Sequence, residues 1–236
     1  MQYSVVIPVH NERESIRILH EELEEVLRFL GRTYEIIFVD DGSADGTTEV
    51  LRSLCSSHPE LLAVYFPNRR GQSAAFETGF ALSSGDVVIT LDADLQNNPR
   101  DIPRLLEKLE EGYDVVCGWR THRCDPWHRR WSSGAANFMR RRFLGEKIHD
   151  VGCSLRVYRK QVLRKLSLGA YGHRFITALL LRSGLKVCEV SVRHHPRRFG
   201  RSKYNLRNRF YESTAGFVRL LLSRSPDLFD QKQCSS

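Results

Sequence analysis

Apolar and polar positions alternate along the first 91 residues in the pattern of successive strand–helix units. Continuous apolar runs predict buried strands over residues 4–9, 34–39, 62–66 and 87–91. Apolar residues at helical spacing predict helices over residues 16–30, 47–54 and 72–82. Strands that are apolar on both faces are typical of a parallel sheet between two layers of helices. The pattern therefore predicts an α/β fold with an open, mostly parallel, twisted sheet flanked by helices.

Beyond residue 91 the pattern is less regular. Further strands are predicted over residues 114–119, 155–158 and 187–192, and further helices over residues 99–111, 132–144, 160–166 and 175–183. Polar loops are expected over residues 121–131 and 193–203. Residues 204–223 have the pattern of a basic amphipathic helix, which fits either a membrane surface or a terminal helix docked on the core.

The length of 236 residues fits one domain with a short appendage. We expect a domain over residues 1–203, with two functional parts that meet near residue 118, and a C-terminal segment over residues 204–236. The longest apolar stretches, at 87–91 and 178–181, are too short to span a bilayer, so we expect no transmembrane helix. The first residues lack a basic n-region, so we expect no signal peptide.

Charge divides unevenly between the two parts of the chain. Residues 1–118 carry 10 Lys or Arg against 21 Asp or Glu, whereas residues 119–236 carry 26 against 7. The net charge of +8 thus combines −11 in the first part with +19 in the second. The basic part should face an anionic partner, such as phosphates, an anionic membrane or nucleic acid. Nucleic acid is disfavoured, because aromatic residues do not interleave the basic runs and the acidic part would repel a phosphate backbone.

The cysteines show neither a CxxC pair nor the spacing of a zinc site. They are Cys55, Cys117, Cys124, Cys153, Cys188 and Cys234. We expect free thiols in a reducing, cytoplasmic compartment.

Two carboxylates and an amide follow the predicted strand over residues 87–91. They are Asp92, Asp94 and Gln96, in the sequence LDADLQ. Hard oxygen ligands at a strand end suit Mg²⁺ or Mn²⁺, which complete their coordination with water and phosphate oxygens. The alternative interpretation is a solvated turn that caps the following helix. The preceding strand and its strand–helix context favour the metal site.

Polar residues also follow the first two predicted strands. Pro8, His10 and Glu12 follow the first, where an imidazole can stack on a base and a carboxylate can accept from ribose or base donors. The alternative is that Asn11 and Glu12 only cap a helix. After the second strand, one Asp of Val39-Asp40-Asp41-Gly42 can accept from a base N–H, whereas Asp45 better fits a helix cap. The chain contains neither a P-loop nor a GxGxxG sequence.

Basic residues in the second part cluster in predicted loops or at the ends of elements. Candidate phosphate ligands are Arg120, Arg129 or Arg130, Arg197 and Lys203, because guanidinium groups pair with phosphate in a bidentate manner. The alternative is a solvated basic surface. Asp150 lies amid this positive charge, and it could orient an acceptor, act as a base, or hold Arg156 in an ordinary ion pair.

Taken together, these motifs resemble a known family of enzymes. The stretches VVIPVHNE, VDDGSADGT, GQSAAFETGF, GDVVITLDADLQNNP, GCSLRVYRK and FGRSKY are similar to those of family 2 glycosyltransferases, which have the GT-A fold. Within that family the chain resembles the polyprenyl-phosphate branch, which includes dolichyl-phosphate mannosyltransferases and undecaprenyl-phosphate aminoarabinose transferases. The similarity covers residues 2–215, nearly the whole chain.

The resemblance implies a role for each matching residue. It implies a metal site at Asp92, Asp94 and Gln96. It implies nucleotide binding in residues 1–118, by Pro8, Val9, His10, Glu12, Val39, Asp41, Asp92 and Ala93, with His10 where the family usually has Tyr. It implies phosphate and acceptor binding in residues 119–203, by Arg120, Arg129, Arg197, Ser202 and Lys203. Catalytic roles are implied for Asp94, Asp150 and Arg197.

The implied reaction moves a sugar from GDP-mannose or a UDP-sugar to a polyprenyl phosphate, with inversion and with Mg²⁺ or Mn²⁺. A saccharide or other hydroxyl acceptor is the alternative within the family, and a nucleic-acid-binding module is the alternative outside it. Many relatives continue into transmembrane helices, whereas this sequence ends after one amphipathic segment. We therefore expect a peripheral protein on the cytoplasmic face of a membrane. A separate membrane-protein partner and a homo-oligomer stay open.

Overall fold

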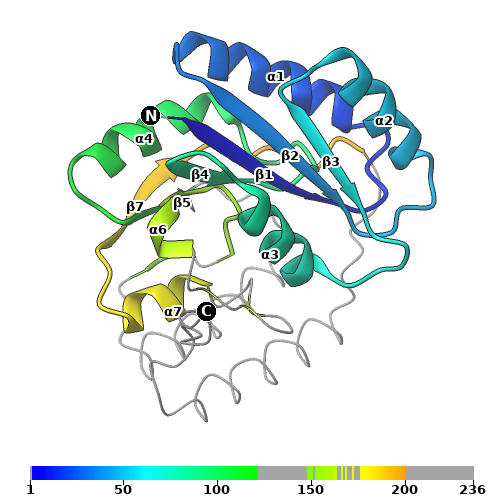
Figure 1. The fold of residues 1–236 in the computed structure, drawn as a ribbon. Coiled ribbons are helices and arrows are strands. Elements are labelled where there is room, and N and C mark those ends of the chain that lie inside the picture. Colours follow the sequence, from blue (N-terminus) through cyan, green and yellow to red (C-terminus); the bar gives the residue numbers. More distant parts are fainter. Residues whose placement is uncertain are drawn as a thin grey trace, which may run out of the picture.

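The computed structural model describes residues 2–121, 148–150, 152–163, 166, 168, 172 and 176–199. Within these ranges the chain forms a seven-stranded sheet with helices on both faces (Figure 1). Several predicted features lie outside the described residues: most of the loop over 121–131, the helix over 132–144, Arg129, Ser202, Lys203 and the segment over 204–236. No helix of the described part combines the length and the apolar composition that crossing a membrane requires.

The first part of the chain follows the predicted strand–helix pattern. Its elements are β1 (Tyr3–Val9), α1 (Ile16–Phe29), β2 (Tyr34–Asp40), α2 (Thr47–Ser57), β3 (Leu61–Tyr65), α3 (Gln72–Leu82) and β4 (Val87–Thr90). A short 3₁₀ turn (Pro99–Asp101) leads into α4 (Ile102–Glu110). The later elements are β5 (Val115–Arg120), β6 (Arg156–Arg159), α6 (Lys160–Leu163), α7 (Ile176–Arg182) and β7 (Val187–Val192). Each element predicted for these ranges is present, and the described part of α6 lies within the predicted helix over residues 160–166.

The sheet has the strand order β3-β2-β1-β4-β6-β5-β7. Strands β1 to β4 pair in parallel, and β5 pairs in parallel with β7. Strand β6 lies antiparallel between β4 and β5. The expected mostly parallel sheet is confirmed. Strands from both sides of residue 118 share this one sheet, so the two differently charged parts of the chain have a common framework.

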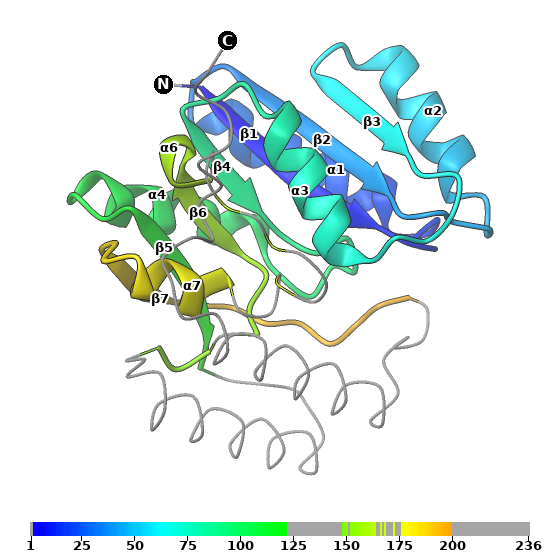
Figure 2. The ribbon, with the colours of Figure 1, turned by 60° about the horizontal axis from the view of Figure 1, so that its bottom comes forward.

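Side chains alternate between the two faces of the sheet because successive residues of a strand point to opposite sides. Val5 and Ile7 of β1 pack with α1, α2 and α4 on one face. Val6 of β1 packs with α3, α6 and α7 on the other. Figures 1 and 2 show α1 and α2 on one side of the sheet and α3 on the opposite side. Gly79 allows α3 to approach β1 closely, since a Cβ atom there would lie 2.2 Å from Val6 Cγ1.

The strand order reverses direction between β1 and β4, so the loops that leave the carboxyl ends of these two neighbouring strands diverge. From β1 the chain proceeds through β2 to β3 in one direction, whereas β4 lies on the other side of β1. The loops that follow β1 and β4 therefore lead away from each other. In open α/β sheets, ligands bind at the carboxyl ends of the strands at such a point.

The described cysteines are free thiols, as expected from their spacing. They are Cys55, Cys117, Cys153 and Cys188. Burial raises the pKa of Cys117 to about 11 and that of Cys153 to about 12. Both therefore stay protonated and act as small apolar groups at neutral pH.

Candidate active site

A cavity of about 130 Å³ lies at the carboxyl ends of β1, β2 and β4. Nine of its lining residues were named as site residues from the sequence: Pro8, Val9, His10, Glu12, Asp41, Asp92, Ala93, Asp94 and Arg197. Arg69 and Gln72 complete the lining. Strand ends that are separate in sequence thus meet in one cavity, as their common direction in the sheet requires.

Asp92 and Asp94 are held by the turn that follows β4. Leu95 has a positive φ of 61°, and the Gln96 N–H donates to Asp94 Oδ1 at 3.2 Å. This Asx-type bond closes the turn and points both carboxylates toward the cavity. The Asp92 N–H donates to Ser154 Oγ at 3.2 Å, so the segment before the antiparallel strand β6 supports the turn from the other side.

The environment of the two carboxylates disfavours two negative charges. Burial raises the pKa of Asp94 to about 6, and the nearby Asp92 carboxylate adds to this effect. Arg197 lowers the pKa, since its Nη1 lies 3.5 Å from Asp94 Oδ2. Two close, half-buried carboxylates beside the Arg197 guanidinium fit a divalent cation, because such an ion would offset their negative charge.

Gln96 lies differently from the other two members of this motif. Its side-chain amide donates to the backbone oxygen of His195 at 3.3 Å, and it does not line the cavity. In this arrangement it joins the turn after β4 to the segment over residues 193–199. Of the three residues of this motif, only Asp92 and Asp94 therefore line the cavity.

Arg197 reaches the cavity from the far end of the described chain. Its guanidinium pairs with Glu12 as well as with Asp94. The segment that carries it is anchored by an isolated bridge between Asn97 and His194 and by the ion pair of Arg193 with Asp101, at 3.1 Å. Residues 193–199 are thus fixed against the turn that carries Asp92 and Asp94, and the Arg197 guanidinium lies beside the acidic groups.

The two aspartates after β2 have separate tasks. Asp40 accepts from Ser43 N–H at 3.0 Å and Thr48 Oγ1 at 2.6 Å, so it organises the turn before α2. Asp41 accepts from the N–H groups of Arg70 and Gly71 at 2.6 and 2.9 Å. It therefore fixes the segment between β3 and α3 against the cavity.

His10 and Glu12 follow β1. The Nδ1 atom of His10 donates to the backbone oxygen of Asp41 at 2.8 Å, which fixes the ring in the cavity wall. Asn11 adopts a positive φ of 53°, and its Oδ1 accepts from the Ala44 N–H at 2.7 Å. The side chains of Asn11 and Glu12 thus contact the neighbouring loop and Arg197, whereas Ser15 is the N-cap residue of α1. The N-cap residue of α2 is Gly46, one position after the predicted Asp45, whose Oδ1 accepts from the Thr47 N–H at 3.0 Å at the start of the helix.

Asp150 and Arg120 form a buried ion pair outside the cavity lining. Arg120 donates from Nε to Asp150 Oδ2 at 2.6 Å and from Nη2 to Oδ1 at 2.9 Å, which is bidentate geometry. Glu189 of β7 accepts from the Asp150 N–H at 2.8 Å. The partner that Asp150 holds here is Arg120, where the sequence had suggested Arg156. Val39 is also outside the lining, because its side chain is fully buried in the core.

Sequence reasoning missed Arg69 and Gln72 as site residues. Gln72 donates from Nε2 to Asp92 Oδ1 at 2.8 Å, and Arg69 Nε lies 3.8 Å from Asp41 Oδ2. A polar run over residues 68–70 after the third predicted strand was the available signal. This run did not identify Arg69 and Gln72 as site residues, because the segment reaches the cavity only through the hydrogen bonds that the Arg70 and Gly71 N–H groups donate to Asp41.

Residues 4–167 match the sequence model of the family described as "Glycosyl transferase family 2". The chain belongs to this family. The resemblance seen in the motifs is thereby confirmed. The match includes β1 to β4 and the turn with Asp92 and Asp94, which form most of the cavity wall.

Relatives of known function include enzymes named undecaprenyl-phosphate 4-deoxy-4-formamido-L-arabinose transferase. The one from Yersinia enterocolitica is 43% identical over 205 residues, which cover 86% of this chain and 62% of the relative. The one from Pectobacterium carotovorum is 44% identical over 204 residues, with the same coverage of 86% and 62%. This chain thus spans about 62% of the length of these relatives.

Solved structures support the fold. Glucosyl-3-phosphoglycerate synthase from Mycobacterium tuberculosis, crystallised with Mn²⁺, UDP and phosphoglyceric acid, superposes with a TM-score of 0.70 at 23% sequence identity. The superposition covers 93% of this chain and 77% of that one. The expected GT-A type of fold is therefore confirmed.

Proposed function

We propose that this chain is a metal-dependent glycosyltransferase that moves a sugar from a nucleoside diphosphate sugar to a polyprenyl phosphate. One observation carries the proposal: a cavity at the carboxyl edge of the sheet holds the Asp92 and Asp94 carboxylates beside the Arg197 guanidinium. Oxygen ligands for a divalent cation and a donor for phosphate oxygens are what a diphosphate-bearing substrate needs.

Known relatives support the substrate class. The relatives at 43–44% identity are named for transfer to undecaprenyl phosphate. The structurally similar synthase was crystallised with Mn²⁺ and UDP, which supports a nucleoside diphosphate and a divalent cation in this cavity. We propose GDP-mannose or a UDP-sugar as the donor, and Mg²⁺ or Mn²⁺ as the cation.

The donor side of the mechanism follows from the residues around the cavity. Asp92 and Asp94 would hold the cation, which when bound offsets the negative charge that develops on the departing diphosphate. Arg197 and Arg69 both line the cavity, where their guanidinium groups would donate to phosphate oxygens. The His10 ring and the Asp41 carboxylate lie at the ends of β1 and β2, where they can contact the nucleoside.

The acceptor side does not require a strong general base. A phosphate monoester is largely ionised near neutral pH, so its oxygen can attack the anomeric carbon directly. One displacement of this kind inverts the configuration of the sugar carbon. Asp150 then acts by orientation, since Arg120 already engages both of its oxygens. A hydroxyl acceptor would instead need a base to remove its proton.

A lipid acceptor places the reaction at a membrane surface. The net charge of +19 over residues 119–236 supports an approach to anionic lipid headgroups. We propose peripheral binding at the cytoplasmic face, with residues 1–203 as the catalytic domain and residues 204–236 as a basic contact segment. A separate membrane protein or a second copy of the chain could assist, and co-purification with membranes would test both.

The decisive experiment offers the chain a panel of nucleotide sugars with Mg²⁺ or Mn²⁺ and a short polyprenyl phosphate, and measures released nucleoside diphosphate. The matched control acceptor is the polyprenyl alcohol, which has the same chain without the phosphate. We expect release only with the phosphate. Equal release with a plain sugar or the alcohol would favour a hydroxyl acceptor, and no release together with no nucleotide binding in calorimetry would contradict the proposal.

A further inference from the structure

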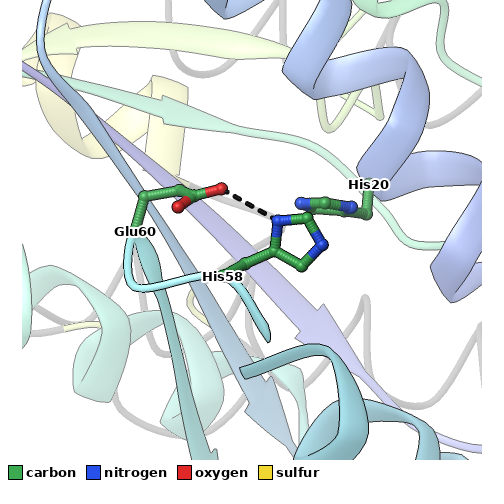
Figure 3. Close-up of side chains that lie close together, drawn as sticks. All are labelled: His20, His58 and Glu60. Atoms are coloured by element: carbon green, nitrogen blue, oxygen red, sulfur yellow. Dashed lines mark hydrogen bonds and ion pairs between the residues drawn. The ribbon is translucent and has the colours of Figure 1, made fainter. Parts of the chain in front are cut away.

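Three metal-ligating side chains lie together at the opposite edge of the sheet. His20 extends from α1, and His58 and Glu60 come from the segment that joins α2 to β3 (Figure 3). Figure 3 shows the two rings side by side, with the Glu60 carboxylate directed toward His58. Because His58 and Glu60 precede β3, the group lies at the amino end of that strand, whereas the cavity lies at the carboxyl ends.

The three side chains are close enough to share one ion. One ligand atom from each lies within 4.8 Å of the other two. His58 Nδ1 donates to Glu60 Oε1 at 3.2 Å, and the ring centroids of His20 and His58 are 4.3 Å apart in an edge-to-face arrangement. Two imidazole nitrogens and one carboxylate oxygen form a familiar ligand set for zinc.

His20 supplies a second, independent observation. Its side chain is only 2% exposed, and its Nε2 atom has no hydrogen-bond partner among the described residues. A buried polar atom without a partner is rare in a folded protein and marks a place where a water or an ion can bind.

The backbone of the other two ligands is also fixed. The His58 N–H donates to the Leu54 oxygen at 3.0 Å, which closes the end of α2. The Glu60 oxygen accepts from the Ile36 N–H at 3.0 Å, which ties this segment to β2. Only the side chains of His58 and Glu60, which are 30% and 21% exposed, have room to adjust.

We propose that His20, His58 and Glu60 form a binding site for a divalent transition-metal ion of the zinc type, with solvent in the fourth position. Tetrahedral zinc holds its ligand atoms about 3.3 Å apart, given metal–ligand bonds of about 2.0–2.2 Å. Small rotations of His58 and Glu60 toward the fixed His20 ring would bring the three atoms to that spacing.

Such an ion would join α1 to the segment between α2 and β3. The site is distinct from the cavity in its ligand chemistry, because Mg²⁺ prefers oxygen atoms whereas imidazole suits zinc, copper, nickel and iron. It is also distinct in position, since the two lie at opposite ends of the strands. The proposal therefore does not depend on the proposed transfer reaction.

The test titrates Zn²⁺ into the metal-free full-length chain by calorimetry and compares the number of bound ions between variants. Glu60→Gln removes one ligand and retains the size of the side chain. Glu107→Gln, at an exposed position of α4, is the matched control. We expect Glu60→Gln and His58→Ala to lose one equivalent of zinc, or to bind it at least about 10-fold more weakly. The control should bind as the unaltered chain does.

A spectroscopic readout locates the ion. Cobalt(II) bound by two imidazoles and a carboxylate in tetrahedral geometry gives visible bands that an octahedral oxygen site does not give, and His58→Ala should remove them. His20→Asn provides a third variant, but the decision rests on His58→Ala, whose partly exposed side chain can be removed without opening the core. Equal zinc stoichiometry and affinity in the unaltered chain, Glu60→Gln and His58→Ala would overturn the proposal, as would the absence of zinc binding altogether.

Discussion

The carboxyl edge and the amino edge of the sheet present different atoms to a ligand. At the carboxyl edge, Asp92 and Asp94 offer oxygen atoms; Gln72 donates to Asp92, and Arg197 forms an ion pair with Asp94. At the amino edge, His20 and His58 offer nitrogen atoms, with a single carboxylate beside them. Charge alone would attract cations to both edges. The kind of ligand atom separates them, because hard oxygens suit Mg²⁺ or Mn²⁺ and imidazoles suit zinc.

The two edges also differ in how their polar groups are satisfied. Each acidic group that lines the cavity has a donor, and these donors come from the β3–α3 segment, from the turn after β4 and from residues 193–199. At the amino edge, the buried Nε2 of His20 has no donor or acceptor within the described chain. Close packing by itself therefore does not supply hydrogen-bond partners to buried polar groups, whereas loops that converge from several strands do.

Removal of divalent cations tests the carboxyl edge most severely. Chelation should reduce transfer to background, because the charge of the departing diphosphate would lose its main counter-charge. Added Mg²⁺ or Mn²⁺ should restore the rate measured by release of nucleoside diphosphate. If transfer also required one equivalent of zinc, the proposed zinc site would affect the reaction in the cavity, and the two sites would not be independent.

Asp94→Asn should lower the transfer rate by at least about 100-fold, because it removes one of the two carboxylates that the turn after β4 presents to the cavity. The matched control is Asp86→Asn, which removes a charge from an exposed position just before the other end of β4. Its rate should stay within about twofold of the unaltered chain, as expected for a surface substitution. Full activity in Asp94→Asn and in Asp92→Asn would refute the site.

Arg197→Ala should lower the rate by about 10- to 100-fold at subsaturating donor, because charge-assisted contacts to phosphate are lost. The neighbouring Arg198→Ala is a close control, since Arg198 is exposed and its Nη1 lies 3.9 Å from Glu22 Oε1 at the surface. Rates would be compared over a range of donor and acceptor concentrations. Similar losses of rate in both variants would mean that the transfer rate depends on the overall positive charge of this segment and not on a specific contact of Arg197.

Gln72→Ala should raise the Mg²⁺ concentration needed for half-maximal transfer by about 10-fold, which is typical when a group that orients a metal ligand is lost. The cause is the loss of the 2.8 Å bond from Gln72 Nε2 to Asp92 Oδ1. Gln161→Ala, at an exposed position of α6, is the control. An unchanged metal requirement would assign Gln72 to the wall of the cavity only.

The smallest effect is expected at the amino edge in metal-free protein. His58→Ala removes the ring that contacts His20 at a centroid distance of 4.3 Å. The free energy of unfolding, measured by urea denaturation with a chelator present, should fall by about 1 kcal/mol. A loss above about 3 kcal/mol would show that His58 supports the core itself.

Much of the fold could be predicted from the sequence because its signals are local. Apolar runs and helical spacing gave β1 to β5 and α1 to α4 within a few residues of their ends. The place of β6 could not be predicted. Its position between β4 and β5 depends on pairs such as Ile89 with Val157 and Val116 with Val157, which join residues far apart in the chain.

The candidate site divides in the same way. Asp92 and Asp94 belong to one short motif after one strand, and both line the cavity. Gln96 belongs to the same motif, yet its amide faces His195, because the turn at Leu95 directs it away. Gln72 lies in the stretch GQSAAFETGF, to which the sequence assigned no ligand role, and only the packing of α3 on β1 and β2 brings it to Asp92.

The sequence by itself determined the identity of the strands and helices, the family, and the acidic strand ends that face a ligand. These depend on neighbouring residues, because periodicity and turn chemistry act over a few positions. Only the tertiary structure decided that Arg197 meets Glu12, which lies 185 positions earlier, and that His20 meets His58 across two helices. Such meetings follow from strand order and from the packing of helices on the sheet, because these bring distant segments together.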